Sequence, residues 1–410
     1  MKTLALVGGM ATVLVPLLTV PAQAGDWPQF RGPGGTAVSE DTDLPVHWSA
    51  TENVRWKVDL PGRGLSNPVI ARGRVYVTAS SGYRQDRLHV LCFDQADGKK
   101  LWERQFWATG NTISNPKTCM AAPTPVTDGE RVYALFATAD LACLDADGNL
   151  VWYRALARDY RNITNQVGMA ASPVLYKDVL IVPMETVGDS FVSGLDKMTG
   201  RNRWKDARAR DINWVTPALV RGGDHDAVVV QSAKELTAYD PETGARQWDF
   251  KCEGLSTIPS PVAGPDAVLV SGRDFQRLRL PADSSPPEVM WKNNRLKSGY
   301  VTPLLYRGRV YTVNPANIFV CGDAATGKIL WQERLNLEGD VSASPVAADG
   351  KVYVVNEGGT TVVVRVGDRP EVLAANELEE TILATPAIAG GALFLRSDKH
   401  LYCIGAKKGK

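Results

Sequence analysis

The 410-residue chain lacks the signatures of several large classes of protein. Its 46 lysines and arginines nearly balance 45 aspartates and glutamates, so a net charge of +1 indicates neither a nucleic-acid-binding surface nor a basic membrane patch. Its four histidines are scattered without the spacing of metal ligands. No nucleophile elbow or Walker loop occurs. We therefore predict no nucleic-acid partner, no catalytic residue and no metal site.

A long apolar run occurs only at the N-terminus. Lys2 precedes the run LALVGGMATVLVPLLTV, which is followed by Pro21 and the sequence AQA at 22–24, with small residues at its first and last positions. This is typical of a secretory signal peptide at 1–24, cut after Ala24. The alternative is a retained membrane anchor, because the run is close to spanning length. The breaks at Pro16 and Pro21 favour cleavage, so we expect a periplasmic or secreted chain with no stable membrane span.

Helical periodicity is nearly absent, and one β-type pattern recurs eight times. Each copy has a small residue, usually hydroxylated, then a proline, an apolar run, a turn and another apolar run, as in ASPVAADGKVYVV at 343–355. The prolines, 41 to 57 residues apart, are Pro68, Pro125, Pro173, Pro217, Pro261, Pro303, Pro345 and Pro386. Each copy has room for four short strands. Units of about 44 residues predict an all-β, eight-bladed β-propeller with four-stranded antiparallel blades.

A turn that ends in tryptophan recurs in five copies, as in VCGDAATGKILW at 320–331. Its aspartate can accept backbone N–H groups within the turn, and its glycine provides the positive φ that closes the hairpin. The tryptophan would lie on the outermost strand, where its ring can cover the seam between neighbouring blades. We assign structural roles to Asp94, Asp145, Asp196, Asp240, Asp323, Gly98, Gly148, Gly200, Gly244, Gly327, Trp56, Trp102, Trp152, Trp204, Trp248, Trp291 and Trp331.

The two ends of the repeat region predict how the ring closes. A strand at 53–60 precedes the first complete unit, whereas the last copy, at 384–405, has only three strands. We predict that the N-terminal strand completes the last blade, which joins the chain ends and removes an open edge. The predicted organisation is a signal peptide (1–24), a lead-in segment (25–52), the propeller (53–405) and a basic tail (406–410).

Six cysteines in an exported chain suggest disulfides, but four of them occupy one recurring position. These four are Cys92, Cys143, Cys321 and Cys403. Because Gly194 and Ala238 stand at the same place in other copies, we interpret it as a packing position for small residues. Equivalent positions on different blades are too far apart to be bridged. Cys119 and Cys252 lie outside this position, and the sequence does not decide whether they form a disulfide.

The repeated pattern small-x-Asp-x-x-Thr-Gly-x-x-x-Trp resembles the quinoprotein-type propeller family over about 53–405. The segment DWPQFRGPGGTAVSEDTDLPVHW, at 26–48, is similar to the lead-in of exported bacterial proteins with PQQ-like repeats. The family contains dehydrogenases that use pyrroloquinoline quinone (PQQ) and non-enzymatic relatives of the BamB type. The resemblance therefore implies either an alcohol or sugar oxidoreductase that uses PQQ and calcium, or a binding scaffold.

Several family features are missing from this chain. For an enzyme, the resemblance implies an adjacent cysteine pair and large insertions that form an active-site funnel, and in some members a haem-attachment sequence. This chain has no adjacent cysteine pair, no haem-attachment sequence and only modest insertions. Gly25 stands where BamB-like members carry a lipid-acceptor cysteine. A calcium site would require carboxylates from several loops to converge; the candidates are Glu185, Asp189, Glu235, Asp274 and Glu357. We favour the non-catalytic scaffold, commit to no cofactor, and keep the PQQ- and calcium-dependent oxidoreductase as the alternative.

The functional residues of a propeller are expected in its loops. Three loops of the first three blades, at 80–87, 106–121 and 154–170, are longer than the others. Their aromatic and arginine side chains are typical of binding surfaces, whereas asparagine also simply forms loops. We predict that this sector of a monomer binds a protein or carbohydrate partner. The candidate residues are Arg84, Arg87, Trp107, Asn111, Asn115, Lys117, Tyr160, Arg161, Asn165 and Gln166.

Overall fold

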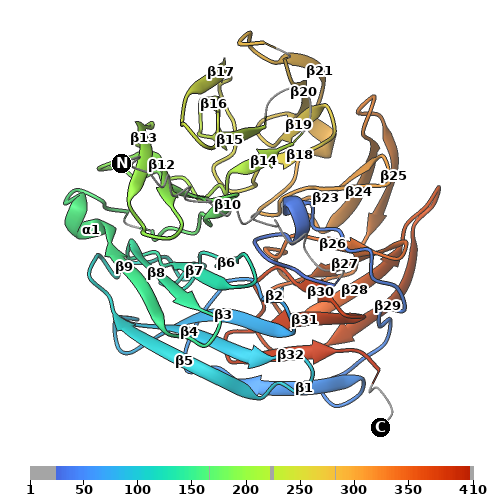
Figure 1. Ribbon diagram of the computed structural model, residues 1–410. Coiled ribbons are helices and arrows are strands. Elements are labelled where there is room, and N and C mark those ends of the chain that lie inside the picture. The colour runs from blue at the N-terminus through green and yellow to red at the C-terminus, as the bar shows by residue number, and fades with distance from the viewer. Residues whose placement is uncertain (1–24, 166, 222–225, 282, 407–410) are drawn as a thin grey trace, which may run out of the picture.

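The computed structural model describes residues 25–165, 167–221, 226–281 and 283–406. The predicted signal peptide at 1–24, Gln166 and residues 407–410 lie outside these ranges. Within them, the strands form eight four-stranded antiparallel sheets arranged around a central axis (Figure 1). The prediction of an all-β, eight-bladed propeller is confirmed. In the described part of the chain, no helix is long and apolar enough to cross a membrane.

The first four blades follow one another along the chain, each running from an inner strand at the axis to an outer strand. Blade 1 contains β2 (Val69–Ala71), β3 (Arg74–Ser81), β4 (Arg87–Asp94) and β5 (Lys100–Trp107). Blade 2 contains β6 (Val126–Thr127), β7 (Arg131–Leu135), β8 (Asp140–Asp145) and β9 (Leu150–Ala155). Blade 3 contains β10 (Val174–Tyr176), β11 (Val179–Met184), β12 (Phe191–Asp196) and β13 (Asn202–Ala207). Blade 4 contains β14 (Ala218–Val220), β15 (Ala227–Gln231), β16 (Glu235–Tyr239) and β17 (Arg246–Lys251).

The remaining blades complete the circle. Blade 5 contains β18 (Val262–Ala263), β19 (Ala267–Val270), β20 (Phe275–Arg279) and β21 (Glu288–Asn293). Blade 6 contains β22 (Leu304–Tyr306), β23 (Arg309–Val313), β24 (Ile318–Asp323) and β25 (Ile329–Arg334). Blade 7 contains β26 (Val346–Ala348), β27 (Lys351–Val355), β28 (Thr360–Arg365) and β29 (Glu371–Glu377). Blade 8 contains β30 (Ala387–Ala389), β31 (Ala392–Arg396), β32 (His400–Ile404) and β1 (Val54–Asp59). The helices are short: η1 (Pro33–Gly35), α1 (Leu156–Asp159) and η2 (Asn294–Leu296).

Blade 8 closes the ring as the sequence predicts. Strand β1 pairs antiparallel with β32, so Trp56 lies opposite Cys403 and the N-terminal strand supplies the outer edge of the last blade. In Figure 1, blue β1 lies beside red β32, which are the two ends of the colour scale. The prediction of closure by the N-terminal strand is confirmed.

The outer-strand tryptophans join neighbouring blades through a hydrogen bond as well as through packing. Trp56 Nε1 donates to the carbonyl of Gln95, 3.0 Å away, in the turn of blade 1. Trp102 donates in the same way to Ala146 of blade 2, at 2.8 Å. The same bond recurs from Trp152, Trp204, Trp291 and Trp331 to the next blade in each case. The buried Trp248 instead packs in an apolar cluster with residues of blade 5, which lacks the turn.

The turn that receives each ring has the geometry expected from its sequence. In blade 3, the Asp196 carboxylate accepts the backbone N–H groups of Met198 and Thr199, and Gly200 has a φ of +69°. A methyl group at Gly200 would lie 2.7 Å from the ring of Trp152. The glycine is therefore required twice, once for its backbone conformation and once because the neighbouring blade's ring occupies the space of a side chain.

The recurring cysteine position lies opposite this tryptophan on the adjacent strand. Cys92 pairs with Trp102 and Cys143 with Trp152, while Gly194 pairs with Trp204. Only a small side chain fits beneath the indole. All six cysteines are free thiols, so Cys119 and Cys252 do not form the disulfide that the sequence left open.

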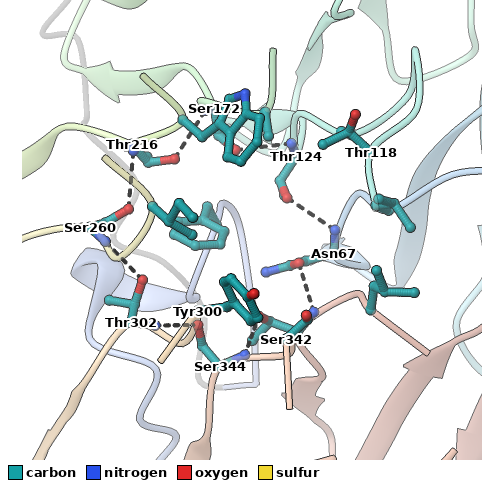
Figure 2. Close-up of a pocket in the computed structure, with 18 of the residues that line it drawn as sticks. Asn67, Thr118, Thr124, Ser172, Thr216, Ser260, Tyr300, Thr302, Ser342 and Ser344 are labelled. Carbon is teal, nitrogen blue, oxygen red and sulfur yellow. Dashed lines mark hydrogen bonds between the residues drawn. The ribbon is translucent and has the colours of Figure 1, made fainter. Parts of the chain in front are cut away.

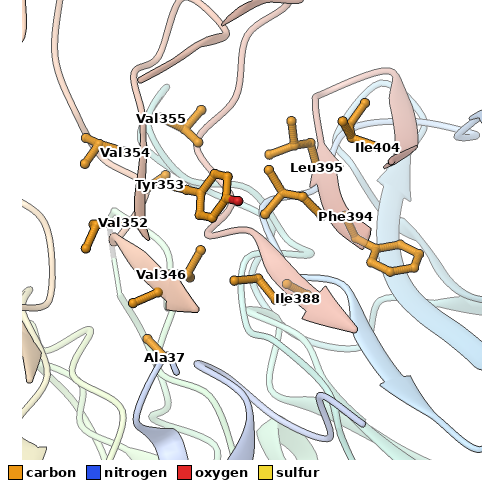
Figure 3. Packing of buried hydrophobic residues seen from close by; sticks show 14 of the residues in the cluster. Ala37, Val346, Val352, Tyr353, Val354, Val355, Ile388, Phe394, Leu395 and Ile404 are labelled. Carbon is orange, nitrogen blue, oxygen red and sulfur yellow. The ribbon is translucent and has the colours of Figure 1, made fainter. Parts of the chain in front are cut away.

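The core lies within and between the blades, and the lead-in segment extends it. Figure 3 shows Tyr353 of blade 7 on the side toward Ile388 and Leu395 of blade 8, with Val352 and Val354 on the opposite side of the strand and Ala37 of the lead-in segment below. Trp27 forms an antiparallel bridge with Ile70 on β2, and Val38 forms a parallel bridge with Ala347 on β26. The lead-in thus pairs with the inner strands of blades 1 and 7. This pairing covers strand edges that would otherwise be unpaired.

We expect Gly200→Ala to lower the free energy of unfolding by about 3 kcal/mol, because it combines left-handed backbone strain with a clash against Trp152. Gly308 is a matched control: its φ is +71°, but nothing lies within 4 Å of the space that a methyl group would take. Gly308→Ala should cost about 1 kcal/mol. Urea denaturation of both variants measures the difference, and equal losses would mean that the indole contact adds nothing.

Candidate functional site

A closed ring of hydrogen bonds surrounds the propeller axis. The residue before each inner-strand proline donates its backbone N–H to the side-chain oxygen of the equivalent residue in the next blade, and every donor–acceptor distance is 3.0 Å. Thr385 of blade 8 donates to Asn67 Oδ1 of blade 1, which closes the ring. Its members are Asn67, Thr124, Ser172, Thr216, Ser260, Thr302, Ser344 and Thr385, and Figure 2 shows the arrangement.

The position before proline explains this ring. A residue before proline is held in an extended conformation. Its backbone N–H is the last donor before the proline, because proline has no backbone N–H. Because this N–H is buried at the axis, it requires an acceptor. The short side chains of serine, threonine and asparagine supply that acceptor from the neighbouring blade. The sequence contains this signal, a serine or threonine before seven of the eight prolines and Asn67 before the other, but the pattern alone does not predict the bonds between blades.

The ring forms the floor of a cavity of about 330 Å³ on the axis. The cavity opens on the face where the outer strand of each blade connects to the inner strand of the next, called here the loop face. All eight of these connections contribute to its wall; the apolar wall residues are Leu65, Ala122, Ala170, Trp214, Ile258, Tyr300 and Leu383. Phe30 of the lead-in segment closes it from the opposite face.

Sequence reasoning missed the aromatic residues of this cavity. Trp214 and Tyr300 stand outside the three long loops at 80–87, 106–121 and 154–170, and Phe30 stands in the lead-in segment. The available signal was that Trp214 lies outside the repeated Asp-x-x-Thr-Gly turn that accounts for most of the other tryptophans of the blades. An aromatic residue at an irregular position in a regular repeat is a reason to expect a site.

Lys117 spans the mouth of the cavity. It comes from the connection between blades 1 and 2. Its Nζ lies 2.6 Å from Asp340, in the connection between blades 6 and 7, and 2.8 Å from Glu357, in blade 7. The same Nζ is 5.0 Å from the centre of the Tyr300 ring. Hydrogen bonds from the ammonium to Asp340 and Glu357 raise the pKa of Lys117, so it stays charged and paired at neutral pH.

The ten residues predicted as a binding surface do not share one environment. Asn115 and Lys117 line the axial cavity. Asn165 is buried, and the ring centre of Tyr160 lies 4.5 Å from that of Phe191, so these two stabilise a loop of blade 2. Gln166 is outside the described residues. The exposed remainder consists of Arg84, Arg87, Trp107, Asn111 and Arg161.

The predicted asparagines mainly stabilise their own loops. Asn111, Asn115 and Asn165 each accept, through the side-chain oxygen, the backbone N–H two residues further on. This is the local turn bond that makes asparagine a common loop residue. The asparagines therefore stabilise the conformation of the loops, whereas the exposed arginine and tryptophan side chains remain available to contact a partner.

Blade 1 projects further on the loop face than its neighbours. Strands β3, β4 and β5 have eight residues each, and β5 ends in Trp107, which is 62% exposed. The Arg87 guanidinium lies 5.4 Å from the centre of the Trp107 ring, and Tyr83 stands fully exposed at the hairpin tip. We call Tyr83, Arg87 and Trp107 the blade 1 patch.

The axial cavity does not fit PQQ with calcium. PQQ carries three carboxylates, whereas Lys117, the one charged side chain among the described residues that line the cavity, is already shared by two carboxylates. Glu185 is buried in an ion pair with Arg208 and does not line the cavity, and Glu357 pairs with Lys117. The described ranges contain no group of three or more His, Cys, Asp or Glu side chains placed to hold a metal ion.

We expect Thr216→Val to lower the free energy of unfolding by about 1–3 kcal/mol, because it leaves the buried N–H of Ser172 without an acceptor. Thr216→Ser keeps the hydroxyl oxygen and should cost less. Thermal unfolding of the two variants makes the comparison. If Thr216→Ser were as destabilising as Thr216→Val, loss of the methyl group would explain the result and the ring bond would not.

Solved structures share this architecture. BamB from Moraxella catarrhalis superposes with a TM-score of 0.66 at 15% identity, covering 87% of this chain and 98% of that one. A europium-containing methanol dehydrogenase superposes with a TM-score of 0.70 at 13% identity, covering 94% and 98%. At these identities the likeness shows the fold alone, a β-propeller.

The sequence assigns the chain to a protein family. It belongs to the family described as outer membrane protein assembly factor BamB, whose profile matches residues 29–250, 90–333 and 282–371. These ranges overlap and together span residues 29–371. A relative, outer membrane protein assembly factor BamB of Yersinia pestis, is 19% identical over 324 residues, which is 78% of this chain and 70% of the relative.

Proposed function

We propose that the protein is an exported, non-catalytic propeller that supports outer-membrane protein assembly by binding a partner protein through the blade 1 patch. Family membership supports the assembly role, since the relatives carry that name. The observation that carries the binding surface is the exposed Trp107 with Arg87 beside it, on a blade that projects from the loop face. Exposed aromatic and arginine side chains are the usual anchors of protein interfaces.

The test is a deletion of the gene in its source bacterium, followed by quantification of β-barrel proteins in the outer membrane. We expect their amount to fall, and to be restored by the wild-type protein but not by the double variant R87A/W107A. Leu330→Ala is the control, because Leu330 is 46% exposed on β25, away from the patch. Normal outer-membrane composition in the deletion strain would refute the assembly role, whereas full rescue by R87A/W107A would refute only the surface.

A further inference from the structure

The floor of the axial cavity carries hydrogen-bond donors that the protein itself leaves unused. Seven ring members are serine or threonine, and each hydroxyl oxygen accepts one backbone N–H. Among the described residues, none of these seven hydroxyl groups donates to a protein acceptor. A hydroxyl both accepts and donates, so this floor can offer O–H groups to a ligand oxygen.

Asn67 adds a donor that is directed into the cavity. Its side chain is 3% exposed, and its Oδ1 is used by the N–H of Thr385. Its Nδ2 has no partner within the described residues, and Figure 2 shows this nitrogen pointing toward the middle of the ring. Leaving a buried amide unpaired is unfavourable, so a ligand oxygen that accepts from Nδ2 would bind with a gain in affinity.

The wall above this floor is apolar and aromatic. Trp214 is held in place by a hydrogen bond from its Nε1 to the carbonyl of Gly168, at 2.8 Å. Tyr300, at the mouth, is 46% exposed. Fixed aromatic rings above a few convergent polar groups are the usual composition of a small-molecule site, and they suit the C–H faces of a sugar ring.

The charges around the mouth select against an anionic ligand. Lys117 contributes one positive charge, and Asp340 and Glu357, which it contacts, contribute two negative charges. Arg31 lies on the far side of the ring, where its guanidinium donates to the carbonyls of Thr302 and Pro303. A neutral ligand is therefore favoured over a carboxylate or phosphate.

We propose that the axial cavity binds a neutral, polyhydroxylated ring: a free monosaccharide or the terminal sugar of an oligosaccharide. Sugar hydroxyls would accept from Asn67 Nδ2 and exchange hydrogen bonds with the ring hydroxyls, while a C–H face lies against Trp214 or Tyr300. A volume of about 330 Å³ is at the lower end of ligand sites and admits one or two sugar rings. This site is separate from the blade 1 patch and does not rest on the assembly role.

The experiment uses the full mature chain and a panel of free neutral sugars: glucose, galactose, mannose and N-acetylglucosamine. Binding is measured by saturation-transfer NMR and by calorimetry, with glucuronate as an anionic counterpart of glucose. We expect at least one neutral sugar to bind with a dissociation constant in the millimolar range or tighter, and glucuronate to bind more weakly. Tyr300→Ala and Asn67→Asp should each weaken binding about tenfold or more. Asn67→Asp keeps the oxygen that accepts from Thr385.

Leu330→Ala is again the matched control, because Leu330 has the same exposed fraction as Tyr300, 46%, and lies on an outer strand. It should leave sugar binding unchanged. If Asn67→Asp fails to fold, Tyr300→Ala decides alone. Absence of binding by all four sugars, stronger binding of glucuronate than of glucose, or equal binding by Tyr300→Ala and the wild type would each overturn the proposal. None of these results bears on the outer-membrane phenotype of the deletion strain.

Discussion

Replacing β1, Val54–Asp59, with a Gly/Ser segment of equal length is expected to lower the free energy of unfolding by about 5 kcal/mol or more. The replacement removes the antiparallel pairing with β32 and exposes that strand as an open edge. It also removes Trp56, whose ring contacts Gly98 and whose Nε1 bonds to Gln95 in blade 1. Loss of a buried tryptophan alone typically costs about 3–5 kcal/mol.

Thermal unfolding measures this effect, with the outer strand of blade 7 as the control. In strand β29, Glu371–Glu377, Ala374 lies opposite Val363, at the position that tryptophan takes in the other blades, so replacing the strand removes an outer strand without removing an indole between blades. We expect the β1 variant to melt at a clearly lower temperature than the β29 variant. Equal melting temperatures would show that β1 contributes no more than any other outer strand.

Arg208→Met is expected to lower the free energy of unfolding by about 3–5 kcal/mol, the usual cost of breaking a buried ion pair. The Arg208 and Glu185 side chains are 0% and 3% exposed, and Nε lies 2.7 Å from the carboxylate. Arg208 also donates to Thr237, Tyr239 and Ser232 of blade 4, so it connects the outer part of blade 3 to the next blade. Its removal leaves Glu185 as a buried charge without a cation.

A double-mutant cycle separates this charge effect from the loss of packing. In R208M/E185Q the buried carboxylate is replaced by a neutral amide, so we expect the double variant to be more stable than Arg208→Met. Urea denaturation of the wild type, the two single variants and the double variant gives the coupling energy. A double variant less stable than Arg208→Met would show that packing and hydrogen bonds, not the unpaired charge, dominate the cost.

The repeated elements were the most predictable part of this protein. The proline period gave the number of blades, and the missing fourth strand of the last copy predicted the pairing of β1 with β32. The proline position and the strand pattern depend on contacts within one blade or between one blade and the next, and both recur in each copy of the repeat. Repetition makes the signal visible even where one copy, such as blade 7, departs from it.

The axial site was not predictable in the same way. Lys117 meets Asp340 and Glu357 across 223 and 240 residues of sequence, and Phe30 reaches the axis from a segment outside the repeats. Asn165 and Tyr160 looked like surface residues because their loop is long and polar, yet one is buried and the other packs on Phe191. No local sequence pattern predicts which residues of eight separate loops converge at the axis.

The sequence by itself determined the blade: its four strands, its turn with aspartate and glycine, the tryptophan on its outer edge and the number of copies. These follow from hydrogen bonding and packing among residues close in the chain or at equivalent positions in neighbouring repeats. Only the tertiary structure decided what lies on the axis, because circular closure brings one residue from every blade to a common centre. The ring of hydrogen bonds that begins at Asn67 and returns to it through Thr385 exists only once the circle is complete.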